Sequence, residues 1–197
     1  MKTQSISSRS KNTSSVRFDP FSSRLARDIR NTLSEAFVDA LLQEDKLCYQ
    51  STAEQWLARN LDDEYAGYIQ DRLTRYDHAF DLVQVNRIKD AKLQTLIIWN
   101  HGLFFEVHEH LERIWHLATG DEYQALKGLI QAAGVYIHLI ANHRSAAERL
   151  AIKSLARIQQ YADQLGFIAN LDVLLNKLTN MDSVPPQLKS PAEISVK

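Results

Sequence analysis

The sequence predicts an all-α protein, an antiparallel helical bundle with an additional N-terminal helical layer. Glycine and proline, which interrupt helices, are scarce: there are six Gly and four Pro among 197 residues, where a typical chain has roughly 12% of the two together. No proline occurs between Phe21 and Val184. Throughout that range the apolar residues follow the helical period, and no alternating strand pattern is seen. The 45% apolar and 24% charged residues fit a globular chain, which excludes a disordered or fibrous one.

The N-terminal layer is predicted over residues 18–86 as three helices. The first, over about 22–44, follows Pro20 and begins at Ser22 or Ser23, as helix starts often do. A short second helix carries Trp56 and is expected to begin at Ser51, because Glu54 three residues later gives the spacing of a capping box. The third covers about 63–83, with one apolar stripe formed by Tyr65, Ile69, Leu73, Tyr76, Phe80 and Val83.

The bundle is predicted over residues 87–180. Its helices are expected at about 88–100, 103–118, 121–142, 144–164 and 168–179. Glycine or asparagine stands at each break, where a left-handed residue or a cap is needed. Because the links are short, neighbouring helices should be antiparallel.

The two ends differ from the middle of the sequence. Residues 1–17 contain six serines, four basic residues and no acid, so we expect a flexible basic tail, or alternatively an organelle or plastid transit segment. Residues 181–197 hold three of the four prolines and are expected to form a C-terminal tail. Without a transit segment, the protein is expected to be soluble and cytoplasmic.

Charge and composition also restrict the partners. The net charge of −1 provides no overall field for nucleic acid, and no nucleic-acid partner is expected. The longest mainly apolar run, over 129–141, is too short for a membrane span. The single cysteine, Cys48, excludes an internal disulfide. A helical bundle with an added layer can form a homodimer, but the sequence identifies neither a small-molecule nor a protein partner.

Chemistry-bearing residues concentrate between 100 and 144. At 100° per residue, His108 and Glu112 share a helix face with large apolar residues, among them Phe105 and Trp115. That face is expected to be buried, and Glu106, His110 and Arg113 are expected to point to solvent. The next helix carries Gln131, His138 and Asn142 on one stripe. The sequence therefore predicts a buried Glu/His cluster between two helices, made by His108, Glu109, Glu112, Gln131 and His138.

Three interpretations of this cluster remain open. It can be a structural polar network, since buried carboxylates need partners. It can bind a divalent metal such as zinc or iron, or a small molecule, with His108, Glu112 and His116 at intervals of four and His138 as a fourth ligand. It can also perform acid–base chemistry through Glu109 or Glu112. We favour a structural or binding role with no assigned reaction; the alternative is a metal- or ligand-dependent, hydrolase-like enzyme that uses His108, Glu109, Glu112 and His138.

The same region resembles a known family. The turn Asn100-His-Gly102, the segment Phe-Phe-Glu-Val-His-Glu-His-Leu-Glu-Arg-Ile-Trp115, and the helix Gly-Leu-Ile-Gln131 with His138 are similar to the family catalogued as domain of unknown function 309, over about residues 90–162. The resemblance implies an all-α bundle and no particular activity. Residues 18–86 have no counterpart in the minimal family domain. The signature positions it implies here are Asn100, Gly102, Glu106, His108, Glu109, Glu112, Trp115, Gln131 and His138.

Overall fold

The computed structural model describes residues 18–194, and within that range it contains helices and no strand. The predicted all-α class is confirmed. The predicted basic tail, residues 1–17, lies outside the described residues. The helices are α1 (Arg24–Gln43), α2 (Leu47–Leu57), α3 (Asp63–Val85), α4 (Ala91–Asn100), α5 (Phe104–Trp115), α6 (Gly120–Ile140), α7 (Arg144–Gln160), the 3₁₀ turn η1 (Ala162–Leu165), α8 (Leu171–Thr179) and α9 (Pro191–Ile194).

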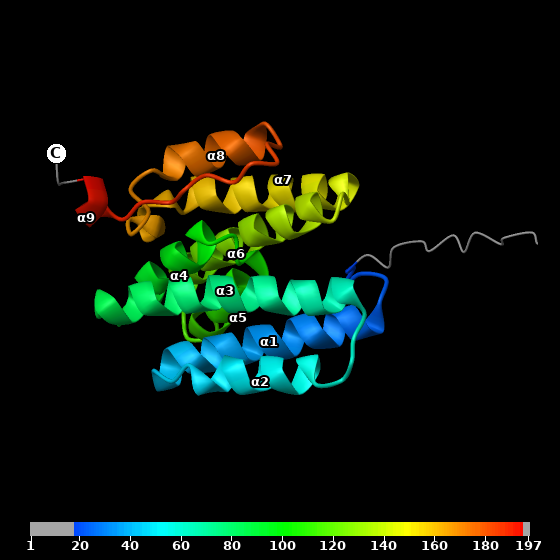
Figure 1. Ribbon diagram of the computed structural model, residues 1–197. Helices are drawn as coiled ribbons and strands as arrows, with labels where there is room; N and C mark the ends of the chain where they lie inside the picture. The colour runs from blue at the N-terminus through cyan, green and yellow to red at the C-terminus, as the bar shows by residue number, and fades with distance from the viewer. Residues whose placement is uncertain (1–17, 195–197) are drawn as a thin grey trace, which may run out of the picture.

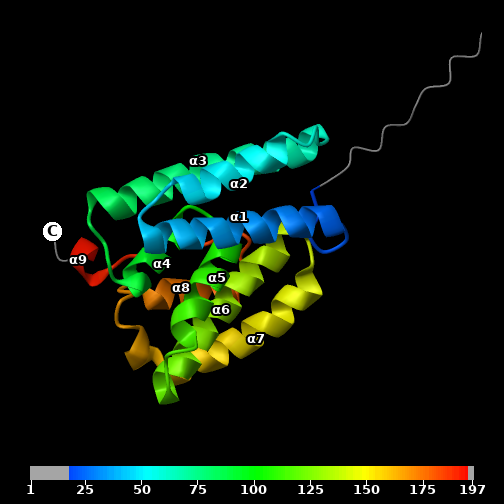
Figure 2. The same ribbon diagram turned by 90° about the horizontal axis from the view of Figure 1, so that it is seen from below.

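Helices α1, α2 and α3 lie together on one side of the molecule, and the remaining helices lie on the other (Figures 1 and 2). Helix α5 is at the junction, because it contacts both α1 and α6. Helices α6 and α7 form a tightly packed hairpin through the turn at 141–143. In the part of the chain that is described, no helix combines the length and hydropathy required to cross a membrane.

A side-chain cap defines the start of α1, whereas the N-cap residue of α2, Lys46, makes no such hydrogen bond. Ser23 accepts a hydrogen bond from the Ala26 amide at 3.2 Å, which confirms a predicted start of α1. The capping box predicted at Ser51 is wrong, because α2 begins earlier, at Leu47. Asp45 accepts from the Leu47 amide at 2.9 Å at that start, and the Ser51 hydroxyl donates to the Leu47 carbonyl at 2.6 Å inside the helix.

Aromatic rings fill the core on both sides of α5. On the N-terminal side, the Phe37 ring stacks on Tyr76 with 4.3 Å between centroids. On the other side, Trp99 meets Tyr136 and Phe104 edge-on, at 5.4 and 5.1 Å. All five side chains are at most 3% exposed. Edge-to-face and offset-stacked pairs of this kind add to the free energy of area burial.

The segment after α8 is docked rather than free. Trp99 donates its indole N–H to the Pro186 carbonyl at 2.9 Å, and Leu188 is 1% exposed. The Asn100 side chain donates to the Leu188 carbonyl and accepts from the Leu188 amide, each at 2.8 Å. Figure 1 shows this segment running back across the bundle to α9. The tail predicted over 181–197 is therefore held against α4 up to Leu188, because α4 offers an indole and an amide that the backbone can pair with.

Close contact between α6 and α7 depends on Gly128. A Cβ atom at this position would lie 3.0 Å from side-chain carbons of Arg157 and Ile158, and 3.3 Å from the Ile158 backbone nitrogen. The buried Ser154 hydroxyl also donates to the Gly128 carbonyl at 2.8 Å. The absence of a side chain at Gly128 thus allows the two helix backbones to approach.

We expect Gly128→Ala to lower the free energy of unfolding, measured by urea denaturation with far-UV circular dichroism. Overpacking costs about 1–3 kcal/mol, more than the roughly 0.5–1 kcal/mol that alanine gains in a helix. Gly67→Ala is the matched control, because nothing lies within 4 Å of its added Cβ atom, and it should be stabilising. Equal effects of the two substitutions would contradict this account of the α6–α7 contact.

Candidate functional site

Helix α5 buries a different face from the one predicted. Glu106 is fully buried and His110 is 2% exposed, whereas both were expected to face solvent. His108 and Glu112, expected in the core, have side chains that are 32% and 39% exposed. The prediction failed because it counted Phe105 among the core residues, and Phe105 instead lines cavities between the layers. Arg113 is exposed as predicted and pairs with Asp39 at 2.8 Å.

Glu106 receives its partners from α3. The Tyr76 hydroxyl donates to Glu106 Oε1 at 2.6 Å. The other oxygen, Oε2, lies 3.6 Å from Arg72 Nη1. A fully buried carboxylate needs such partners, because desolvation without them costs several kcal/mol. The pair Arg72 and Tyr76 therefore makes burial of Glu106 possible and fixes α3 against α5.

The charge of Glu106 alters the pKa values of Arg72 and Tyr76. Burial disfavours the charged guanidinium, but Glu106, together with Tyr68, Tyr76 and Asp71, more than offsets this and raises the pKa of Arg72. Burial and the adjacent Glu106 raise the pKa of Tyr76 well above its ordinary value. Tyr76 is thus held as a neutral hydroxyl that donates to Glu106.

His110 is a neutral histidine in the core. Its Nε2 lies 3.0 Å from the Ala91 carbonyl, which can only accept, so Nε2 carries the proton and donates. Nδ1 is buried and has no hydrogen-bond partner in the structure. Burial lowers the pKa of His110 to about 4, and the nearby Arg113 acts in the same direction. His110 thus joins α5 to α4 as a packed, uncharged side chain.

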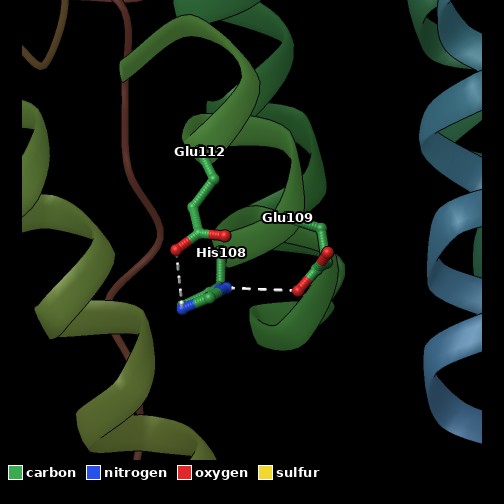
Figure 3. Close-up of side chains that lie close together, drawn as sticks. All are labelled: His108, Glu109 and Glu112. Atoms are coloured by element: carbon green, nitrogen blue, oxygen red, sulfur yellow. Dashed lines mark hydrogen bonds and ion pairs between the residues drawn. The ribbon is translucent and has the colours of Figure 1, made fainter. Parts of the chain in front are cut away.

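The Glu/His cluster is present, but all three of its members come from α5 and are partly exposed (Figure 3). His108 Nδ1 lies 3.3 Å from Glu109 Oε1, and His108 Nε2 lies 3.6 Å from Glu112 Oε1. One ligand atom from each residue lies within 4.8 Å of the others, and no other such group of His, Cys, Asp or Glu exists among the residues described. The α-helical spacing alone brings these side chains together.

The remaining predicted site residues make contacts outside this group, although Gln131 and His138 line one cavity together with His108. Trp115 donates to the Tyr123 carbonyl at 3.1 Å and anchors the start of α6. Exposed His116 packs against the Trp115 ring. Gln131 accepts from Arg157 at 3.1 Å. His138 stacks on Phe21 at 4.9 Å, and burial lowers its pKa. Asn100, a signature position implied by the family resemblance, holds Leu188 as described above.

Two cavities lie between the N-terminal layer and the α5–α6 pair. The larger, of about 370 Å³, has walls from the segment before α1, from α1 and α3, and from α5 and the end of α6. The smaller, of about 300 Å³, is lined by His108, His138 and Gln131 among others. Arg30 and Phe105 line both cavities, so the two spaces are neighbours separated by these side chains.

Residues 93–150 match the family model described as Domain of unknown function (DUF309). This confirms the resemblance seen in the sequence and places the family's segment from α4 into α7. Comparison with curated proteins and with solved structures gives no match. Both the Glu/His cluster and Glu106 lie within the segment that matches this family model.

The sequence interpretation did not identify Arg30, Arg72 or Tyr76 as site residues. A signal was present for Arg72, because it lies three residues after Ile69 and four before Tyr76. That spacing puts it on the apolar stripe of α3. An arginine in the middle of a core-facing stripe indicates a buried carboxylate elsewhere in the chain.

Arg72→Met should lower the free energy of unfolding by about 3–5 kcal/mol, because Glu106 would be left buried without a cation. The double variant Arg72→Met with Glu106→Gln should recover most of this loss, since it removes both charges. Urea denaturation of both variants measures the difference. Equal losses in the single and double variants would show that the two charges do not depend on each other.

His110 should make the protein less stable in mild acid. Its pKa is about 4 in the folded protein against an ordinary value of 6.5. As the pH falls from 6.5 to 4, the unfolded chain binds this proton and the folded chain does not. The free energy of unfolding should therefore fall by about 3 kcal/mol from this group. Urea denaturation of wild type and His110→Gln across this pH range tests the prediction. If the free energy of unfolding varied with pH in the same way for both proteins, the prediction would be wrong.

Proposed function

We propose that the cluster of His108, Glu109 and Glu112 binds a divalent transition-metal ion, and that metal binding is the function of this part of the chain. The observation that carries the proposal is that one imidazole and two carboxylates lie together, with one potential ligand atom from each within 4.8 Å of the others. His108 and Glu112 would hold the ion, and Glu109 would orient the imidazole. Imidazole nitrogen and carboxylate oxygen together suit ions such as Zn²⁺, Fe²⁺ and Mn²⁺.

The distances support distinct roles for the two glutamates. The 3.6 Å between His108 Nε2 and Glu112 Oε1 exceeds an ordinary hydrogen bond. It is near the separation of about 3.4 Å expected for two donors on one tetrahedral ion with bonds of about 2.1 Å. Glu109 lies on the other side of the ring and can accept from Nδ1–H at 3.3 Å. That contact would fix the tautomer and orient Nε2 toward the ion.

The partial exposure of the cluster bears on its chemistry. The three side chains are 27–39% exposed, so solvent can complete the coordination. An ion with open positions can polarise a bound group or activate water. The purely structural alternative is a surface pair four residues apart on a helix, which contributes only about 0.2–0.5 kcal/mol and does not need a metal.

We expect Zn²⁺ or Mn²⁺ to bind the wild-type protein in isothermal titration calorimetry. His108→Ala and Glu112→Gln should each weaken binding at least about tenfold, because each removes a ligand. Glu109→Gln should weaken it roughly tenfold by loosening the ring, a typical effect of an outer-shell partner. His116→Ala is the matched control on the same helix, and it should bind like wild type.

A metal-dependent rise in the thermal midpoint provides a second readout, because an ion that binds only the folded chain stabilises it. The proposal is wrong if neither ion gives heat or raises the midpoint of the wild type. It is also wrong if His116→Ala weakens binding as much as His108→Ala does.

A further inference from the structure

Arg30 of α1 occupies an unusual position for a charged group. Its guanidinium carbon lies 3.8 Å from the centroid of the Phe105 ring, and its Nε and Nη2 donate to Asn31 at 3.1 and 2.9 Å. It forms no salt bridge with any carboxylate in the described part of the chain. Burial lowers its pKa, and the nearby Tyr68, Glu106 and Glu109 oppose this shift without reversing it.

Two further guanidinium groups face the larger cavity from α3. Arg72 has Nε and Nη1 atoms that are buried and donate no hydrogen bond. Arg75 pairs with Asp71 at 2.9 Å and donates to the His101 carbonyl at 3.0 Å. Gly102 leaves room for Arg75, since a Cβ atom there would lie 2.8 Å from its Nη1.

The carboxylates nearby already have partners. Asp71 is paired with Arg75, and Glu106 lies behind Arg72. Asp19, at the rim, accepts hydrogen bonds from the Phe21 amide and the Ser22 hydroxyl within its own turn. Arg30 is therefore the arginine lining this cavity that has no salt-bridge partner among the described residues, whereas Arg72 and Arg75 are paired with Glu106 and Asp71.

Aromatic rings, together with aliphatic side chains from Pro20 and the end of α6, form the rest of the enclosure. Phe18 stacks on Tyr68 with centroids 3.6 Å apart, and Phe104 and Phe105 lie on the α5 wall. The volume of about 370 Å³ falls within the roughly 300–1,000 Å³ usual for small-molecule sites. Flat apolar walls with a few convergent polar groups are also typical of such sites.

We propose that this cavity binds a small organic anion, with a flat apolar body between the aromatic walls and a single acidic group on Arg30 and Arg72. A planar guanidinium fork suits a carboxylate, sulfonate or phosphate, because it can donate two parallel hydrogen bonds. The anion would supply the missing counter-charge to Arg30, and the positive charge of Arg72, which lines the same cavity, would add to its attraction. The site differs from the proposed metal cluster, since His108, Glu109 and Glu112 do not line this cavity.

A pair of fluorescent probes of nearly the same shape tests the proposal: 8-anilinonaphthalene-1-sulfonate, which is anionic, and N-phenyl-1-naphthylamine, which lacks the sulfonate. Both are titrated against the full chain in the presence of EDTA. The anionic probe should bind wild type more tightly. Arg30→Gln should weaken its binding about 10–100-fold, as expected for loss of a charged hydrogen bond. The same variant should change the affinity of the neutral probe less than about twofold, because only the charge contact is lost.

Arg24→Gln is the matched control, since it removes the same charge from α1 at a side chain that is 91% exposed; its binding should equal that of wild type. Phe105→Leu should weaken the binding of both probes, because it removes a flat aromatic ring from the cavity wall. Thermal midpoints show that each variant is folded. The proposal is wrong if the anionic probe does not bind, or if Arg30→Gln affects both probes alike. Because Glu112→Gln removes a proposed metal ligand but does not line this cavity, it should bind both probes normally, and failure here is distinguishable from failure of the metal site.

Discussion

The buried carboxylate of Glu106 is the constraint on which the arrangement of α5 depends. It lies in the core with no access to water, and its hydrogen-bond and ion-pair partners, Tyr76 and Arg72, both come from α3. Because a desolvated carboxylate is costly without them, the N-terminal layer must lie where α3 can reach α5. This contact turns the opposite side of α5, with His108 and Glu112, toward solvent.

The larger cavity is consequently lined by residues from two parts of the chain. The family match covers residues 93–150, and that segment supplies the Glu/His cluster and the Phe104–Phe105 wall. The cavity is closed by Phe18, Arg30 and Tyr68, which precede the matched segment. The residues before α4 therefore do more than cover the bundle: they provide the arginines and several of the aromatic side chains that line the larger cavity.

The fold class and most helix positions could be predicted because they depend on local signals, namely the apolar period and glycine or asparagine at the breaks. The contact of His108 with Glu112 was predictable for the same reason, since it needs only helical spacing. The buried face of α5 could not be predicted in this way, because the partners of Glu106 are about 30 residues away in the sequence. Without them, Glu106 looks like a solvent-facing acid and Phe105 looks like a core residue. The position of His138 likewise depends on how two helices cross, which periodicity does not specify.

The Phe105 ring lines both cavities and therefore connects them physically. The guanidinium carbon of Arg30 lies 3.8 Å from the centroid of the Phe105 ring. The His108 ring stacks on Phe105 with 6.0 Å between centroids and an interplanar angle of 10°. A change in the position of this ring at one cavity alters the wall of the other. If an occupant of one cavity changes the binding free energy in the second cavity, an occupant of the second must change the binding free energy in the first by the same amount and with the same sign.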